Sequence, residues 1–203
     1  APRVVLATGG LSLPKTGSDG AGYRLAKSLG HSIVQPVPAL EPLVLSGTFH
    51  SALSGIAHEA AIRAAREGDK PVIVKGSVLW THFGISGPAA LDVSRFYRRA
   101  RAEGASATMT MSFVPERTPE DIDRELLRMN REAPHSKAAS ELSRRFGIPQ
   151  GLAMALADAA LGAFGGEPGR DRVAGRVTRE ERRALVTALT AFPLDVVDGR
   201  GYN

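Results

Sequence analysis

The stretch HEAAIRAAREGDKPVIVKGSVLWTHFGISGP, residues 58–88, decides the fold class at the centre of this 203-residue chain. Its first part is rich in Ala, Arg and Glu, so local propensity is compatible with a helix. The run KPVIVKGSVLW that follows is largely apolar and has glycine and proline punctuation, as strands do. Because strand neighbours often override local propensity, we interpret the stretch as strands joined by a turn at EGDKP.

Further strands are predicted on both sides of this stretch. LVLSG at 43–47 and ASATMTMSFVP at 105–115 are apolar or alternating runs bounded by glycine or proline. Between them, SGPAALDVSRFYRRA at 86–100 predicts a short helix with Pro88 near its first turn. Trp80 is most simply a core or interface residue. Residues 43–114 are therefore predicted to form a mainly β, barrel-like domain.

Residues 115–193 change to helical periodicity. Thr118 is placed as an N-cap with Asp121 three positions later, and Thr178 with Glu181 matches a capping box. Pro193 closes the last helix. Four short helices joined by short loops predict an all-α bundle, with segments 118–130, 136–149, 149–164 and 178–193. Its Glu125, Glu132 and Glu141 alternate with arginines, which favours surface pairing at i, i+4 spacing.

The N-terminal stretch RVVLATGGLSLPKTGSDGAGYRLAKSLGHSIVQP, residues 3–36, predicts strand, glycine loop, helix and strand, an order typical of the edge of an α/β sheet. Glycine loops line cofactor pockets, because the backbone can approach a ligand closely, but they also serve chain geometry alone. The pattern leaves both interpretations open. At the other end, LDVVDGRGYN at 194–203 predicts a strand whose pairing partner lies outside the chain.

Composition excludes several classes of protein. No apolar run approaches the ~18 residues of a membrane span, and the chain has no cysteine for disulfides or thiolate metal sites. The histidines show no metal-site spacing with carboxylates, so no metal is expected. A cytoplasmic protein fits these features. The net charge of +5 keeps a nucleic-acid-binding module open, although most arginines sit beside acidic residues on predicted helices.

A second motif, LWTHFGISGP at residues 79–88, carries candidate chemistry. His82 could act as a general acid or base, because its ordinary pKa lies near neutrality, or it could be a structural histidine. Thr81 beside it is a further polar candidate. Ser86 lacks the G-x-S-x-G setting of a hydrolase nucleophile, so that chemistry has no support.

Taken together, the motifs at 4–45 and 79–94 resemble bacterial NAD(P)/FAD-dependent oxidoreductases of the BaiN or aminoacetone-oxidase type. The resemblance implies an α+β chain: a small β-barrel followed by a helical bundle, inserted into an FAD-binding domain. It implies a partial FAD-domain segment at 1–42, the barrel at 43–114, the bundle at 115–193 and a segment returning to the FAD domain at 194–203.

The resemblance also implies roles for individual residues. It places Ala7, Thr8, Gly9 and Gly10 beside the flavin, and Lys15, Thr16 and Gly17 in a loop facing the isoalloxazine ring. FAD would be the cofactor of a longer parent protein and NAD(P)H a candidate electron donor. Thr81 and His82 would contact a small-molecule substrate.

The chain lacks the G-x-G-x-x-G phosphate-binding turn of FAD domains. We therefore expect it to be a piece of that parent, to need the remainder of the FAD-binding domain as its partner, and not to be catalytically competent alone. A nucleic-acid-binding module or a dimerisation domain are the alternatives.

Overall fold

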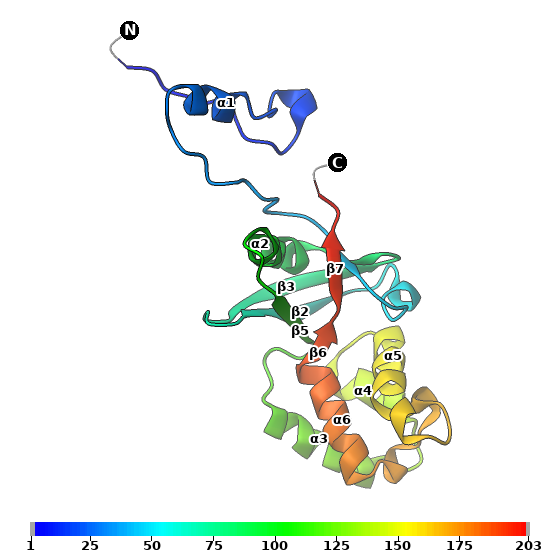
Figure 1. Ribbon diagram of the computed structural model, residues 1–203. Coiled ribbons are helices and arrows are strands. Elements are labelled where there is room, and N and C mark those ends of the chain that lie inside the picture. The colour runs from blue at the N-terminus through cyan, green and yellow to red at the C-terminus, as the bar shows by residue number, and fades with distance from the viewer. Residues whose placement is uncertain (1–2, 202–203) are drawn as a thin grey trace.

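A computed structural model describes residues 3–201 of the chain (Figure 1). Its N-terminal segment contains the short turn η1 (Pro14–Thr16) and the helix α1 (Ala21–Ser28). The strands predicted at 3–8 and 31–36 do not form. A strand needs a neighbour for its backbone hydrogen bonds, and within the described residues nothing pairs with these two stretches. The predicted α/β edge is therefore not seen here.

The centre of the chain is an antiparallel sheet, as the sequence predicts. Its strands, with bounds, are β1 (Leu43–Leu45), β2 (Ala57–Arg66), β3 (Val72–Thr81), β4 (Gly84–Ser86), β5 (Ala107–Ser112), β6 (Phe192–Leu194) and β7 (Val196–Gly199). They are arranged in the order β6-β5-β2-β3-β4-β1-β7. Strands rather than a helix form at 57–66, because alternate residues Ala60, Ile62 and Ala64 all point into the core.

The two edge strands close this sheet into a barrel. β6 pairs with β5 and β7 pairs with β1, yet Asp195 alone separates β6 from β7 in sequence. The amide of Ser46 donates to the carbonyl of Asp195 at 2.9 Å, which continues the pairing across the gap. Residues 192–199 thus join both edges, and closure satisfies the backbone groups that an open edge would leave unpaired.

This closure corrects two expectations about the end of the chain. The strand predicted to lack a partner has one, because β7 pairs with β1. Pro193, predicted to close the last helix, lies in β6, and the helix ends earlier, at Thr190. The barrel therefore takes strands from both sides of the helical part. Residues 202–203 of the predicted return segment lie outside the described residues.

One helix covers the barrel, and four form the bundle. α2 (Pro88–Ala102) packs on the sheet through Val93 and Tyr97, with Pro88 in its first turn as predicted. The bundle consists of α3 (Pro119–Glu132), α4 (Ala138–Phe146), α5 (Gln150–Leu161) and α6 (Arg179–Thr190), with short turns η3 (Gly162–Phe164), η4 (Gly169–Asp171) and η5 (Ala174–Arg176). The predicted caps at Thr118 and Thr178 both form.

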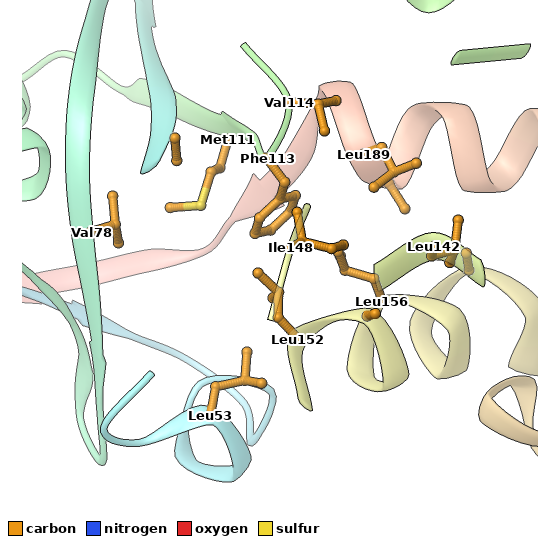
Figure 2. Close-up of a cluster of buried hydrophobic side chains, with 14 of the residues drawn as sticks. Leu53, Val78, Met111, Phe113, Val114, Leu142, Ile148, Leu152, Leu156 and Leu189 are labelled. Atoms are coloured by element: carbon orange, nitrogen blue, oxygen red, sulfur yellow. The ribbon is translucent and has the colours of Figure 1, made fainter. Parts of the chain in front are cut away.

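The barrel and the bundle share one hydrophobic core (Figure 2). Phe113, directly after β5, lies beside Ile148 of the bundle, whereas Met111 points toward Val78 of the barrel, and the short turn η2 (Ser51–Leu53) adds its leucine. Trp80 is fully buried, which confirms its predicted core position. The predicted α+β class, a barrel combined with a helical part, is confirmed, and the continuous core makes these two parts one packed unit.

Candidate functional site

The glycine loop predicted to line a cofactor folds back on α1. The amide of Gly20 donates to the carbonyl of Gly10 at 3.0 Å, and a Cβ on Gly22 would lie 2.1 Å from Thr8 Oγ1. Gly9 has a φ of +70°, which glycine adopts without strain. These glycines therefore have a structural role of their own. Ala7 and Thr8 themselves remain exposed to solvent.

The second half of the loop, Lys15 to Gly17, is a single exposed turn. Thr16 Oγ1 donates to the carbonyl of Leu13 at 2.9 Å, and nothing lies within 4 Å of the Cβ position of Gly17. The turn is therefore accessible from solvent, and the placement of Lys15, Thr16 and Gly17 beside a flavin ring stays a prediction.

The same segment does not fit the diphosphate of FAD. The N-terminus of a helix attracts anions through its free amides, but at α1 the Asp19 carboxylate accepts from the amide of Ala21 at 2.9 Å. This hydrogen bond and the one from Arg24 lower the pKa of Asp19. Because a carboxylate already binds the first amide of this helix, the start of α1 is a poor site for the phosphates.

The LWTHFGISGP motif forms a β-hairpin between β3 and β4. Thr81 Oγ1 donates to the carbonyl of Gly84 at 3.1 Å. The ring of His82 is exposed and stands edge-on to Phe83, with 5.1 Å between ring centroids. Among the described residues, none hydrogen-bonds to the His82 ring or forms an ion pair with it. His82 is therefore accessible for chemistry but has no partner within this chain that would orient it.

The glycines of this motif are required by the barrel. A Cβ on Gly84 would lie 2.2 Å from the carbonyl oxygen of Leu43, and one on Gly87 would lie 2.9 Å from that of Ser77. Such contacts are closer than any side chain permits, so glycine is needed for strand β4 to approach its neighbours. Part of the motif therefore has a packing explanation, which leaves Thr81 and His82 as its chemical candidates.

The two groups of predicted site residues are not brought together in this structure. Within residues 3–201, every hydrogen bond of the stretch 3–34 stays inside that stretch. The first contact with the barrel unit is at Gln35, whose carbonyl accepts from Arg99 at 3.4 Å. The position of the glycine loop relative to the hairpin thus depends on the connecting residues 35–42.

A buried ion pair holds those connecting residues, and sequence reasoning missed it. The carboxylate of Glu41, which is 1% exposed, accepts both from Nε and from a terminal nitrogen of Arg98 on α2. Arg98 also donates to the carbonyl of Gly199 at 2.9 Å and to Asp198 at 3.1 Å. We call Glu41, Arg98, Asp198 and Gly199 the Glu41–Arg98 cluster. The hydrogen bonds with Glu41 raise the pKa of the Arg98 guanidinium. No short-range spacing could have revealed the cluster, because its members are far apart in sequence.

A histidine that sequence reasoning left unassigned lies partly buried beside the shared core. Trp80 Nε1 donates to His58 Nε2 at 2.9 Å, and His58 Nδ1 lies 3.0 Å from the carbonyl of Glu59. This arrangement requires the neutral tautomer with the proton on Nδ1. Burial lowers the pKa of His58 and outweighs the Glu59 contacts that raise it. His58 is therefore a structural residue.

The bundle's carboxylates converge on one arginine. The predicted i, i+4 pairing holds for Glu141 and Arg145, but Glu125 and Glu132 reach the same guanidinium from α3. The Arg145 side chain is only 7% exposed. Burial opposes its charge, but the three hydrogen-bonded carboxylates outweigh that effect and raise its pKa. This group is a buried network and not a surface pattern, because tertiary packing brings two helices together.

Two classes of site are missing from the part of the chain that the structure describes. Within residues 3–201 no three His, Asp or Glu side chains are placed to hold a metal ion. No helix in the same range is long and apolar enough to cross a bilayer.

Comparison with known proteins gives a consistent result. The family described as HI0933-like protein barrel and H2TH domain matches residues 37–203. The 3-dehydro-bile acid delta(4,6)-reductase of Clostridium scindens is 34% identical over 116 residues, which is 57% of this chain and 28% of that protein. The ribosomal RNA dihydrouridine synthases of Haemophilus influenzae and Escherichia coli are 36% identical over 98 residues and 30% identical over 96. Each match covers 47% of this chain, and 23% and 24% of those proteins. The matched part thus spans about a quarter of each relative.

Proposed function

Because the chain belongs to the HI0933-like barrel and H2TH domain family, we propose that it is the barrel-and-helix part of a flavin-dependent reductase. The predicted kinship with BaiN-type flavoproteins is confirmed by this match and by the bile-acid reductase. The proposal is that FAD is bound mainly by the remainder of a longer protein. The present chain would supply one wall beside the ring and a cover over the substrate.

The reaction we propose is the reduction of a carbon–carbon double bond conjugated to a carbonyl group. A delta(4,6)-reductase acting on a 3-dehydro bile acid and a synthase of dihydrouridine both take their names from the loss of such a double bond. Their names therefore share one chemistry although their substrates differ. Bound flavin, once reduced by a donor such as NAD(P)H, would supply a hydride to one carbon of the double bond and return to the oxidised state, and a proton must reach the other carbon.

The observation that carries this proposal is the exposed glycine loop in a chain of this family. Residues 7–9 and 15–17 are exposed and, apart from Lys15, carry small side chains, and the space around Gly17 is open, which suits one face of a flavin ring. Thr81 and His82 are proposed as the polar contacts of the substrate. His82 is exposed, so its ring is accessible to a bound substrate and is the proposed proton donor. The packed barrel would exclude water from the ring on its side.

The proposed partner is the remainder of the FAD-binding domain. Val4, Val5 and Val34 are 78%, 87% and 79% exposed, and they lie on the two stretches that were predicted as strands. Exposed apolar residues on unpaired, extended backbone favour pairing with a neighbouring sheet edge. Added strands from that domain would supply both the hydrogen bonds and the apolar cover.

RNA as the substrate has support only from the relatives. Two of them are named for ribosomal RNA. In the helical part of this chain, however, carboxylates engage several of the arginines, including Arg145, Arg172 and Arg182. Phosphate binding needs basic side chains gathered on one face. The structure therefore does not favour one substrate source, and the experiment must distinguish them.

The test uses the full-length gene product that contains this chain. We expect it to purify with flavin, seen as absorbance near about 450 nm. The NAD(P)H-reduced enzyme should be reoxidised anaerobically either by a 4,6-dienone steroid or by ribosomal RNA, with dihydrouridine detected by mass spectrometry. Purification without flavin, or no reoxidation by either substrate class, would contradict the proposal.

A further inference from the structure

The chain enters and leaves the barrel at one place, on adjacent strands. Residues 36–42 lead into β1, and β7 leads out along the same edge (Figure 1). The amide of Arg200 donates to the carbonyl of Pro42 at 3.1 Å, so the incoming and outgoing backbones lie side by side. Any domain attached at either end would be connected to the barrel through this pair of segments.

The Glu41–Arg98 cluster fixes both segments to the same helix. Arg98 binds Glu41 of the incoming segment with a two-pronged contact and the carbonyl of Gly199 of the outgoing one. The amide of Gly201 donates to the same Glu41 carboxylate, and the amide of Glu41 donates to Ser94 Oγ at 3.2 Å. A planar guanidinium makes such multiple contacts in one geometry, which a lysine cannot reproduce.

Gly199 shows how closely the outgoing segment must approach. A Cβ at this position would lie 2.3 Å from Glu41 Oε1, with both other carboxylate atoms within 2.6 Å. The carboxylate thus occupies the space of a side chain. Contacts this close fix the outgoing segment at Gly199 against the incoming segment at Glu41, where both pass α2.

The cluster's position argues against a role in the barrel's stability alone. The barrel closes because β6 pairs with β5 while the directly following β7 pairs with β1, and its core is made of apolar side chains such as Trp80 and Ile85. A buried ion pair stabilises a fold little compared with apolar residues of the same shape, whereas it can specify a geometry. Within the described residues, the stretch 3–34 forms no hydrogen bond with the barrel unit. Its orientation therefore depends on the connecting residues 35–42, of which this cluster holds Glu41.

We propose that Arg98 is a positioning residue that sets the orientation of the barrel unit relative to the glycine loop at 7–17. The proposal rests on the proposed function for its purpose, since that loop is the one proposed to face the flavin. Through Glu41 and Gly199, Arg98 keeps the hairpin with His82 at a fixed place relative to the ring. Without it the barrel unit swings about residues 35–42.

The test measures orientation without any flavin. The chain has no cysteine, so Lys27→Cys on α1 and Ser140→Cys on α4 accept two spin labels cleanly. We expect one narrow distribution of label distances in the otherwise unchanged 203-residue chain. The double variant Glu41→Gln, Arg98→Met removes both charges and leaves no unpaired buried ion, and it should lose the narrow distribution.

Two controls keep the result interpretable. Arg95→Met is the matched control, because Arg95 lies on α2 but pairs with Asp92 at 2.8 Å and not with the connecting segments. It should keep the narrow distribution. The fluorescence of Trp80, the single tryptophan, reports whether the barrel remains folded. If the double variant does not fold, Arg98→Lys replaces it, because lysine keeps the charge but loses the two-pronged contact.

Two outcomes overturn the proposal. One is a distribution in the folded double variant, or in Arg98→Lys, that is as narrow as that of the unchanged chain. The other is an unchanged chain whose distribution is already as wide as that of the variant.

In the flavin-bearing full-length protein, the variant should raise KM more than it lowers kcat. A protein without flavin would contradict the proposed function, while the distance measurement would still decide the role of Arg98.

Discussion

Trp80 donates its indole N–H to Nε2 of His58 across 2.9 Å, inside the aromatic cluster where the barrel meets the bundle. The rings of Phe49 and Phe113 pack near the same indole, with centroids 5.5 and 6.5 Å away. A protonated imidazole would place a second hydrogen against the indole N–H. The contact between Trp80 and His58 therefore exists only while the histidine is neutral.

Stability should fall in mild acid because of this histidine. The pKa of His58 in the folded chain is lowered by burial, so the unfolded chain binds the proton first. The contribution of neutral His58 to the free energy of unfolding is therefore complete at pH values above the ordinary histidine pKa of about 6.5. It declines as the pH falls from there to the folded pKa, by at most about 1.4 kcal/mol per pH unit. Urea unfolding between pH 7.5 and 5, followed by Trp80 fluorescence, measures this decline. The variant His58→Gln keeps an acceptor for Trp80 and should reduce the change of unfolding free energy with pH in that range. The same pH dependence in both proteins would show that His58 does not cause the decline.

Removing Arg145 should destabilise the bundle strongly. Glu141 and Glu125 would be left partly buried without their cation, and breaking such a pair costs about 3–5 kcal/mol. Arg145→Met should show this loss in chemical denaturation. Arg128→Met is the matched control, because Arg128 is 61% exposed and should cost less than about 1 kcal/mol. Equal losses in the two variants would contradict the buried-network interpretation.

Gly84→Ala should prevent the barrel from closing normally. Its Cβ would lie 2.2 Å from the Leu43 carbonyl oxygen, so β1 and β4 would have to separate. We expect the free energy of unfolding to fall by more than about 4 kcal/mol, which few single substitutions reach. Gly162→Ala has no neighbour within 4 Å of the new methyl group and should stay within about 0.5 kcal/mol of the unchanged chain. Thermal unfolding of both variants measures these losses of stability. A small loss for Gly84→Ala would contradict the prediction, because it would show that β1 and β4 can move apart at little cost.

His82→Ala should reduce turnover of the flavin-bearing full-length protein without changing its stability. The ring is exposed and, among the described residues, its aromatic contact is the edge-on one with Phe83, so its loss opens no buried cavity. If it donates the proton, kcat should fall by about 10²- to 10⁴-fold. His135→Ala removes another exposed histidine, on the bundle, and should leave kcat unchanged. Kinetics of His82→Ala that match the unchanged enzyme with several electron acceptors would remove it from the proposed site.

The 203-residue chain by itself should retain little or no FAD. The Asp19 carboxylate occupies the amide of Ala21 and places a negative charge at the start of α1, which disfavours phosphate there. Equilibrium dialysis against FAD should show no saturable binding at micromolar concentrations. Stoichiometric yellow protein from this chain would contradict the expectation.

Much of the helical part could be predicted from the sequence, because its signals are local. Thr118 and Thr178 cap their helices through residues three positions away, and Gly147 ends α4 in the left-handed conformation. Strand formation at 57–66 was predicted against local propensity, from the neighbouring strand patterns. The N-terminal strands were predicted from the same kind of pattern and do not form, because a strand also needs a partner.

The candidate site divides in the same way. The sequence alone identified the family and nominated the glycine loop, Thr81 and His82 as candidates, since motifs of contiguous residues carry them. Only the tertiary structure decided that β7 closes the barrel on β1, that Glu41 meets Arg98 and that Trp80 meets His58. These contacts join residues separated by many positions, and their energy comes from burial that exists only after the chain has folded. Local spacing cannot encode them, because a pattern along the chain contains no information about which distant faces will meet.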